Sequence, residues 1–298
     1  MKQAANIEPG VSGAAVRPGP DQLMDTLFAH TNISDAAFAH FQALLFERIG
    51  IRLSSEKKAL LCGRLAKRLK ERGLRDYDEY YALIAKGRDP AELQIAIDLL
   101  TTNETYFFRE PKHFEFLSRF LEEGKCAGTS GRGLRVWSAA CSSGEEPYSI
   151  AMVLAEHLGA APWEIVASDV STRMLERARV GHYSLERAKG IPPEYLAAYC
   201  LKGVGKQEGT LLIERTLRER VAFRHLNLMD VPADLGTFDI VFLRNVLIYF
   251  DLETKRKVIE RVAARIKPGG HLLVGHSESL NGITNAIVAE APAIYRKP

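Results

Sequence analysis

The stretch Leu134-Arg-Val-Trp-Ser-Ala-Ala-Cys-Ser-Ser-Gly-Glu-Glu-Pro147 decides the fold, because an apolar strand runs through a turn of small residues into a helix. Further apolar strands separated by helical segments are expected at 165–168, 221–225, 238–243 and 271–275. Continuous apolar strands that alternate with helices indicate a parallel sheet covered on both faces. We therefore predict an α/β fold with a Rossmann-like sheet.

The segments around this sheet have a different pattern. Helical periodicity is predicted at 34–50, 56–72, 77–84 and 93–100. We expect a flexible segment at 1–30, a helical domain with its linker at 31–110, and the sheet domain at 111–298. Residues 181–220 interrupt the alternation of strands and helices. They contain a Pro-Pro pair, several glycines and a short strand, which predicts a small β insertion.

Composition excludes several classes of protein. The 298 residues are 46% hydrophobic and 26% charged, which is typical of a globular chain and excludes collagen-like or largely disordered ones. No apolar run approaches the roughly 20 residues that span a bilayer, and the N-terminus lacks a signal-peptide pattern. The four cysteines form no CxxC pair and the histidines no HExxH motif. We therefore expect a cytoplasmic protein without a metal site or membrane insertion.

Acidic side chains follow two of the predicted strands, where ligands bind in open α/β sheets. Glu145 and Glu146 begin a helix after a turn with one glycine, so a phosphate site is disfavoured and a ligand with a positive charge is favoured. Asp169 ends the second strand, where an acid commonly holds ribose hydroxyls. These features describe S-adenosylmethionine better than a dinucleotide. Alternatively, the glutamates only complement the helix dipole and Asp169 is a helix N-cap.

Polar residues also follow the third and fourth predicted strands. Asn227 and Leu228 could contact an adenine edge or form a plain turn. Arg244 and Asn245 interrupt an apolar run and need partners if they are buried, which favours a ligand contact. The linker Thr101-Thr-Asn-Glu-Thr-Tyr-Phe-Phe-Arg109 has more hydroxyl and aromatic groups than a hinge needs, so we expect it to form a wall of the site.

Five segments together resemble the CheR family of chemotaxis receptor methyltransferases. They are Thr102-Asn103 to Arg109-Glu110, Val136 to Ser149, Ala167-Ser-Asp169, Phe242 to Asp251 and Gly275-His-Ser-Glu278. The resemblance implies a class I methyltransferase sheet, an all-helical N-terminal domain, a small antiparallel β insertion and S-adenosylmethionine as cofactor. It implies methyl-ester formation on glutamates of chemoreceptors. The implied cofactor-binding residues are Asn103, Thr105, Arg109, Glu146, Asp169, Asn227, Leu228, Arg244 and Asn245. The neighbouring Glu145 is not in this set.

The resemblance also places Arg109 and Tyr249 near the reacting methyl group. A glutamate with a pKa near 4.3 is already ionised at neutral pH, so its methylation needs alignment but no general base. The sequence shows no Ser-His-Asp or Cys-His arrangement. We hypothesise that Arg109 orients the substrate carboxylate and that Tyr249 helps to place the methyl group.

The small net charge of +3 conceals two oppositely charged segments. Residues 57–75 contain eight basic side chains and one acidic one, whereas 76–104 contain seven acidic and two basic ones. Such a basic helix face is usually only solvated. With the family resemblance, it predicts docking of acidic receptor helices through Arg64, Lys67, Arg68 and Arg72.

Further partners follow from the resemblance. The insertion at 181–220 is similar to a subdomain that binds a receptor C-terminal peptide in some relatives; its alternative is a lid. We expect a monomer that binds no nucleic acid. Two other functions remain open, a methyltransferase with another substrate and a non-enzymatic scaffold that binds the cofactor.

Overall fold

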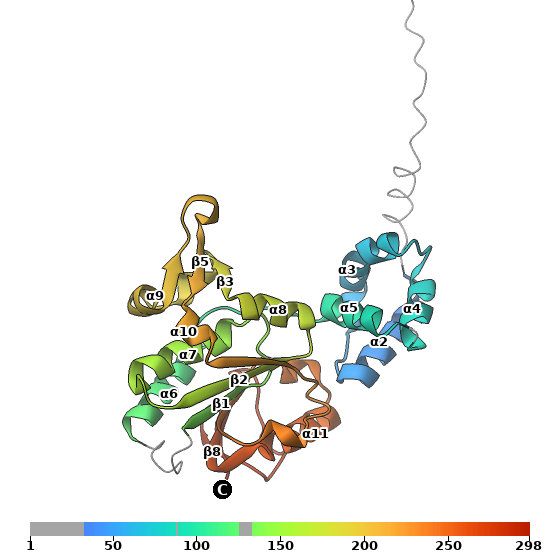
Figure 1. The fold of residues 1–298 in the computed structure, drawn as a ribbon. Coiled ribbons are helices and arrows are strands. Elements are labelled where there is room, and N and C mark those ends of the chain that lie inside the picture. The colour runs from blue at the N-terminus through green and yellow to red at the C-terminus, as the bar shows by residue number, and fades with distance from the viewer. Residues whose placement is uncertain (1–32, 88, 125–132) are drawn as a thin grey trace, which may run out of the picture.

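The computed structural model describes residues 33–87, 89–124 and 133–298, so the segment 1–30, predicted to be flexible, lies outside the described residues. A helical domain stands beside a larger sheet domain, and a small β insertion projects from the latter (Figure 1). Among the described residues, no helix is long and apolar enough to cross a membrane.

The N-terminal domain is all-helical, as predicted. Its helices are α2 (Asp35–Ile49), α3 (Lys58–Glu71), α4 (Tyr77–Ala85) and α5 (Pro90–Leu100). Ser34, Asp76 and Asp89 cap α2, α4 and α5 by accepting backbone N–H groups that lack a partner within the helix. Apolar side chains from all four helices form one buried core.

The sheet has seven strands in the order β6-β2-β1-β7-β8-β10-β9. The bounds are β1 (Leu134–Ser138), β2 (Trp163–Asp169), β6 (Val221–His225), β7 (Phe238–Leu243), β8 (Ile266–Val274), β9 (Val288–Ala291) and β10 (Ile294–Arg296). The pairs among β6, β2, β1, β7 and β8 are parallel, whereas β10 is antiparallel to both of its neighbours. The predicted parallel α/β sheet is confirmed, with an antiparallel strand inserted near one edge.

Helices cover both faces of the sheet, so that alternate strand residues are buried in two separate cores. Val136 belongs to the core with α6 (Lys112–Glu122) and α7 (Glu145–Leu158). Trp137 belongs to the core with α11 (Leu252–Ala263). This alternation is the period of two that a β-strand imposes. Helix α8 (Thr172–Val180) follows β2 along the chain.

The segment after α11 differs from the prediction. The sequence predicted a strand only at 271–275, but α11 ends at Ala263 and β8 already begins at Ile266, so it includes Lys267-Pro-Gly-Gly270. Strand pairing explains the difference, since Lys297 N donates to Gly270 O and Gly269 N to Lys297 O. The register between β7 and β8 shifts at this place. Gly270 fits here because a Cβ would lie 2.7 Å from Asp239 O.

The insertion is a three-stranded antiparallel sheet, which confirms the prediction. Its strands are β3 (His182–Ser184), β4 (Cys200–Lys202) and β5 (Thr210–Ile213), with β5 in the middle. It also contains a 3-10 turn, η3 (Arg187–Gly190), and the short helices α9 (Pro193–Tyr199) and α10 (Arg215–Arg218). The turn η3 lies against the linker, because a Cβ on Gly190 would come within 2.2 Å of Phe107 O.

Candidate active site

A cavity of about 300 Å³ lies at the carboxyl ends of β1, β2, β6 and β7. The linker at 101–109 and residues 49–60 of the helical domain form its other walls. Every residue predicted to bind cofactor or to act in catalysis lines this cavity: Asn103, Thr105, Arg109, Glu146, Asp169, Asn227, Leu228, Arg244, Asn245 and Tyr249. The fold thus brings together side chains from five separate segments.

Asp169 lies at the carboxyl end of β2, and two backbone groups fix its carboxylate. Ser142 N donates to Oδ2 at 2.8 Å and Ser171 N donates to Oδ1 at 2.9 Å. Burial raises the pKa of this carboxyl, although both hydrogen bonds act in the opposite direction. A carboxylate has about four acceptor sites, so each oxygen keeps capacity for one ligand hydroxyl. The helix after β2 is capped by Ser171, which leaves Asp169 available to the cavity.

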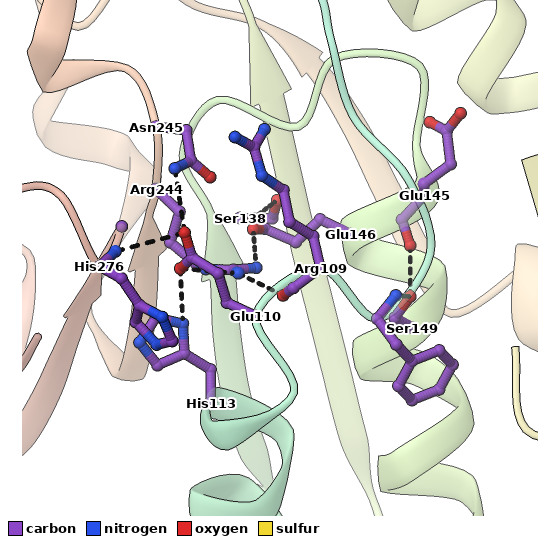
Figure 2. Close-up of polar contacts among 12 residues, drawn as sticks. Arg109, Glu110, His113, Ser138, Glu145, Glu146, Ser149, Arg244, Asn245 and His276 are labelled. Atoms are coloured by element: carbon purple, nitrogen blue, oxygen red, sulfur yellow. Dashed lines mark hydrogen bonds and ion pairs between the residues drawn. The ribbon is translucent and has the colours of Figure 1, made fainter. Parts of the chain in front are cut away.

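Arg244 links two carboxylates beneath the cavity (Figure 2). Its guanidinium donates to Glu146 Oε2 at 2.9 Å and to Glu110 Oε2 at 3.1 Å, and it also donates to Arg109 O. Only 2% of the Arg244 side chain is exposed. Glu146 also accepts from Ser138 Oγ at 2.7 Å. Buried charges need such partners, so this network fixes the first turn of α7 and the end of the linker together.

Glu110 is held by a full set of donors. Asn245 Nδ2 donates to it at 3.1 Å and His276 N at 3.2 Å, in addition to Arg244. Burial raises the pKa of the Glu110 carboxyl, but the hydrogen bond from Asn245 and the Arg244 charge outweigh burial, and the net pKa is lowered. Asn245 therefore faces Glu110 while also lining the cavity.

Glu145 points away from the Arg244 network (Figure 2), and its partner Arg187 belongs to the β insertion. Its side chain is fully buried, pairs with Arg187 at 2.5 Å and accepts from Ser143 Oγ at 2.7 Å. Burial raises the pKa of this carboxyl against the effect of Ser143 and Arg187. Gly144 does not line the cavity. A Cβ there would meet Ala178 and the Tyr183 hydroxyl at 2.8 Å, so this glycine serves packing and not ligand approach.

The linker presents Arg109 to the cavity. Arg109 Nη1 donates to Glu104 O at 3.0 Å, and the guanidinium lies over the ring of Tyr106 at 5.6 Å. The facing wall carries Tyr249, whose carbonyl accepts from Arg52 N at 2.9 Å. A cationic group and a phenol thus line the same cavity.

Asn227 joins the site to the helical domain. Its Nδ2 donates to Arg48 O at 2.7 Å, and its Oδ1 accepts from Met229 N at 2.9 Å. The side chain amide is therefore already engaged within the protein, which leaves the neighbouring backbone and Leu228 to face the cavity.

The backbone around the cavity is strained. Among the described residues, five non-glycine residues have positive φ. Ser142 and Asn245 line the cavity, and Phe108 and Glu110 flank the cavity-lining Arg109. Such conformations cost about 1–3 kcal/mol each and cluster at functional sites. The hydrogen bonds to Glu110 and Asn245 maintain this geometry.

Three site residues were not singled out from the sequence. Glu110 and Ser138 belong to the Arg244 network, and Glu278 accepts from Asn245 N at 2.9 Å and Gly275 N at 2.7 Å. Burial raises the pKa of the Glu278 carboxyl. Glu110 and Glu278 lie in two of the quoted family segments. Of these, only Glu278 offered a signal in the sequence, an acid shortly after an apolar strand.

Much of the basic face of α3 is engaged within the protein. Arg68 pairs with the buried Glu92, and Arg72 pairs with Asp89 at 2.9 Å. Arg64 Nη1 donates to Leu100 O and Thr101 O at 3.0 and 2.9 Å. Lys67 is 87% exposed and pairs only loosely with Glu71. Three of the seven acids at 76–104, Glu79, Asp89 and Glu92, are therefore internal partners of the basic segment, which the sequence pattern did not reveal.

The potential metal-ligand atoms of Glu110, His113 and His276 lie within 4.8 Å of one another. The Glu110 carboxylate already contacts the Arg244 cation, which would repel a metal ion. We assign no metal to this cluster.

Comparisons with known proteins agree with this architecture. Residues 36–101 match the family model for the CheR methyltransferase all-alpha domain, and residues 103–292 match the CheR methyltransferase SAM-binding domain. The chemotaxis protein methyltransferase of Escherichia coli K12 is 39% identical over 93% of this chain and 96% of that protein. Chemotaxis protein methyltransferase 1 of Pseudomonas aeruginosa is 40% identical over 84% of this chain and 92% of that protein.

Among solved structures, the N-methyltransferase NodS of Bradyrhizobium japonicum has a TM-score of 0.37 and 16% identity, over 67% of this chain and 95% of that one. The sheet, the cavity at its carboxyl edge and the matching SAM-binding domain define an S-adenosylmethionine-dependent methyltransferase. The chain belongs to the CheR methyltransferase family.

Proposed function

We propose that this enzyme transfers the methyl group of S-adenosylmethionine to glutamate side chains of chemoreceptors in the cytoplasm. The E. coli and P. aeruginosa relatives are chemotaxis protein methyltransferases, which supports a substrate of the chemotaxis system. The main observation behind this proposal is that Asp169, Glu146, Arg109 and Tyr249 all line one cavity. Asp169 and Glu146 suit a cofactor with hydroxyl groups and a positive charge, and Arg109 suits an anionic substrate.

The cofactor would be held by side chains that are already fixed. The free acceptor sites of Asp169 would bind the two ribose hydroxyls, and Glu146 would face the cofactor's ammonium group. Asn103, Thr105, Leu228 and Asn245 would complete the walls. Since these groups are fixed by hydrogen bonds within the protein, binding would require little reorganisation.

The reaction would be an in-line displacement. A glutamate carboxylate oxygen forms a bond to the methyl carbon while the methyl–sulfur bond breaks, and its electron pair stays on sulfur. The products are the methyl ester and S-adenosylhomocysteine, and no proton moves. Arg109 would orient the carboxylate, and Tyr249 would help to place the methyl group.

The test is methylation of receptor-bearing membranes with S-[methyl-³H]adenosylmethionine, followed by base treatment. We expect base-labile label on glutamate, because methyl esters hydrolyse in base. Arg109→Ala should lower turnover at saturating cofactor by about tenfold or more while the cofactor still binds. Label that resists base would indicate a different acceptor. Cofactor binding without transfer to any receptor would favour a scaffold.

For receptor docking, we propose a surface around Lys67 on the exposed side of α3. Charge reversal of Arg64 or Arg68 would break contacts within the protein, so Lys67→Glu is the cleaner variant. Lys257→Glu is the matched control, because Lys257 on α11 is also exposed and pairs with a glutamate four residues away. Lys67→Glu should raise the KM for receptor and leave cofactor affinity unchanged. Equal KM values for both variants would disprove this surface.

The β insertion would bind a receptor C-terminal peptide by strand addition, since β3 and β4 form the two edges of its sheet. Removal of the last residues of the receptor should then raise the receptor KM. An unchanged KM would indicate another role for these edges. We propose a monomer, which light scattering of the purified chain would check.

A further inference from the structure

The base of the β insertion contacts two of the five segments that line the cavity, the linker and the turn after β1. Tyr183 on β3 donates its hydroxyl proton to Ser143 O at 2.7 Å, and its ring packs edge-on against Phe107 at 5.0 Å. Gly190 at the end of η3 packs directly against the Phe107 carbonyl. The insertion therefore contacts the turn after β1 and the linker at the same time.

Arg187 lies at the centre of these contacts. A single nitrogen, Nη2, donates to Thr105 O at 3.3 Å and to Ser143 Oγ at 3.2 Å, and pairs with Glu145 Oε1 at 2.5 Å. Thr105 lines the cavity, whereas Ser143 and Glu145 form the turn into α7, next to Glu146. Ser142 Oγ donates to Asn103 O at 3.2 Å, so turn and linker are also joined on the cavity side.

We propose that Arg187 is a positioning residue for cofactor binding, through which the β insertion holds the linker and the turn in their binding geometry. Arg187 does not line the cavity, so it acts through Thr105 and the turn and not by direct contact. The linker has left-handed backbone at Phe108 and Glu110. Such a segment keeps its shape only where its surroundings impose it. The insertion is thus a structural part of the cofactor site.

This inference rests on the proposed cofactor site, and it must be separated from a purely structural role. Arg187 also neutralises Glu145, whose side chain is fully buried, and an unpaired charge there would destabilise the fold. The double variant Arg187→Met/Glu145→Gln removes both charges. It should recover most of the melting temperature that Arg187→Met loses. It should not recover cofactor affinity, since the contacts to Thr105 and Ser143 remain absent.

The experiment measures the Kd of S-adenosylhomocysteine by calorimetry together with the melting temperature, on the full chain. Arg187→Met and the double variant should both raise the Kd about tenfold. The Kd of Arg187→Lys should lie within about threefold of the wild-type value, because a single nitrogen of Arg187 makes all three contacts and a lysine can supply one. Arg215→Met is the matched control, since Arg215 lies in the same insertion in an exposed pair with Glu219, and its Kd should not change.

A double variant with wild-type affinity would overturn the proposal, because Arg187 would then only neutralise a charge. An Arg187→Met variant with a Kd within twofold of wild type would overturn it as well. A different result would show that the cofactor does not bind at the proposed site. In that case Asp169→Ala would leave the Kd unchanged, whatever Arg187→Met does.

Discussion

Replacement of Arg244 by methionine should destabilise the sheet domain strongly. The side chain is almost fully buried and contacts Glu146, Glu110 and a backbone carbonyl. Removal of one partner from a buried ion pair costs about 3–5 kcal/mol, because the remaining charge is left in a poorly solvated place. Methionine has a similar length and can still contact the Phe114 ring, so loss of packing contributes little.

The two carboxylates that remain keep part of their compensation. Glu110 retains its donors from Asn245 and His276, and Glu146 retains Ser138. We therefore expect the lower end of the range, a loss of about 3 kcal/mol in the free energy of unfolding. That is a large fraction of the 5–15 kcal/mol typical of a folded protein.

Urea unfolding followed by tryptophan fluorescence measures this effect. The chain has two tryptophans, Trp137 on β1 and Trp163 on β2, so fluorescence reports on the sheet domain. Arg224→Met on β6 is the control; that side chain is exposed and should change the free energy by less than about 0.5 kcal/mol. A loss below about 1 kcal/mol for Arg244→Met, at an unchanged m-value, would refute the reasoning.

Three further predictions follow from buried groups. Burial lowers the pKa of His113 to about 3, so the unfolded chain binds more protons between that pH and about 6.5. Stability should fall as the pH drops through this window, by up to about 1.4 kcal/mol per unit; His113→Leu should reduce that slope in urea titrations at several pH values. Glu92→Gln should cost the helical domain about 2–3 kcal/mol in circular-dichroism unfolding, since Arg68 and Tyr80 lose a charged partner. Asp169→Asn should weaken S-adenosylhomocysteine binding at least tenfold in calorimetry, and an unaffected Kd would remove Asp169 from the site.

The sequence predicted the sheet and the gathering of the site residues because both depend on local patterns. Apolar strands before Asp169 and Arg244 place these residues at the same edge of a parallel sheet. The partners of these residues could not be predicted, since Glu110 and Arg244 are 134 positions apart in the chain. Local pattern also failed where tertiary pairing decided, as in the entry of Lys267-Pro-Gly-Gly270 into β8.

The internal pairing of charges in the helical domain could not be predicted from the sequence either, because it also depends on tertiary contacts. An arginine-rich helix face looks solvated in the sequence, yet the acids that neutralise Arg68 and Arg72 come from α5 and the residue before it. Which of several charged faces meet inside a domain depends on helix packing, which periodicity alone does not determine.

The contact of Arg64 with the end of α5 has a consequence for protein engineering. The matches to the two family models meet at residues 101 and 103, which suggests a point for exchanging the helical domain between relatives. The junction is not a free hinge, because Arg64 binds the carbonyls of Leu100 and Thr101 there. Asp98 also accepts from Thr172 of the sheet domain at 2.8 Å. A functional chimera should therefore keep Arg64, Asp98 and Thr172 from the same parent protein. A chimera joined between residues 101 and 103 without regard to these contacts should have its two domains wrongly oriented.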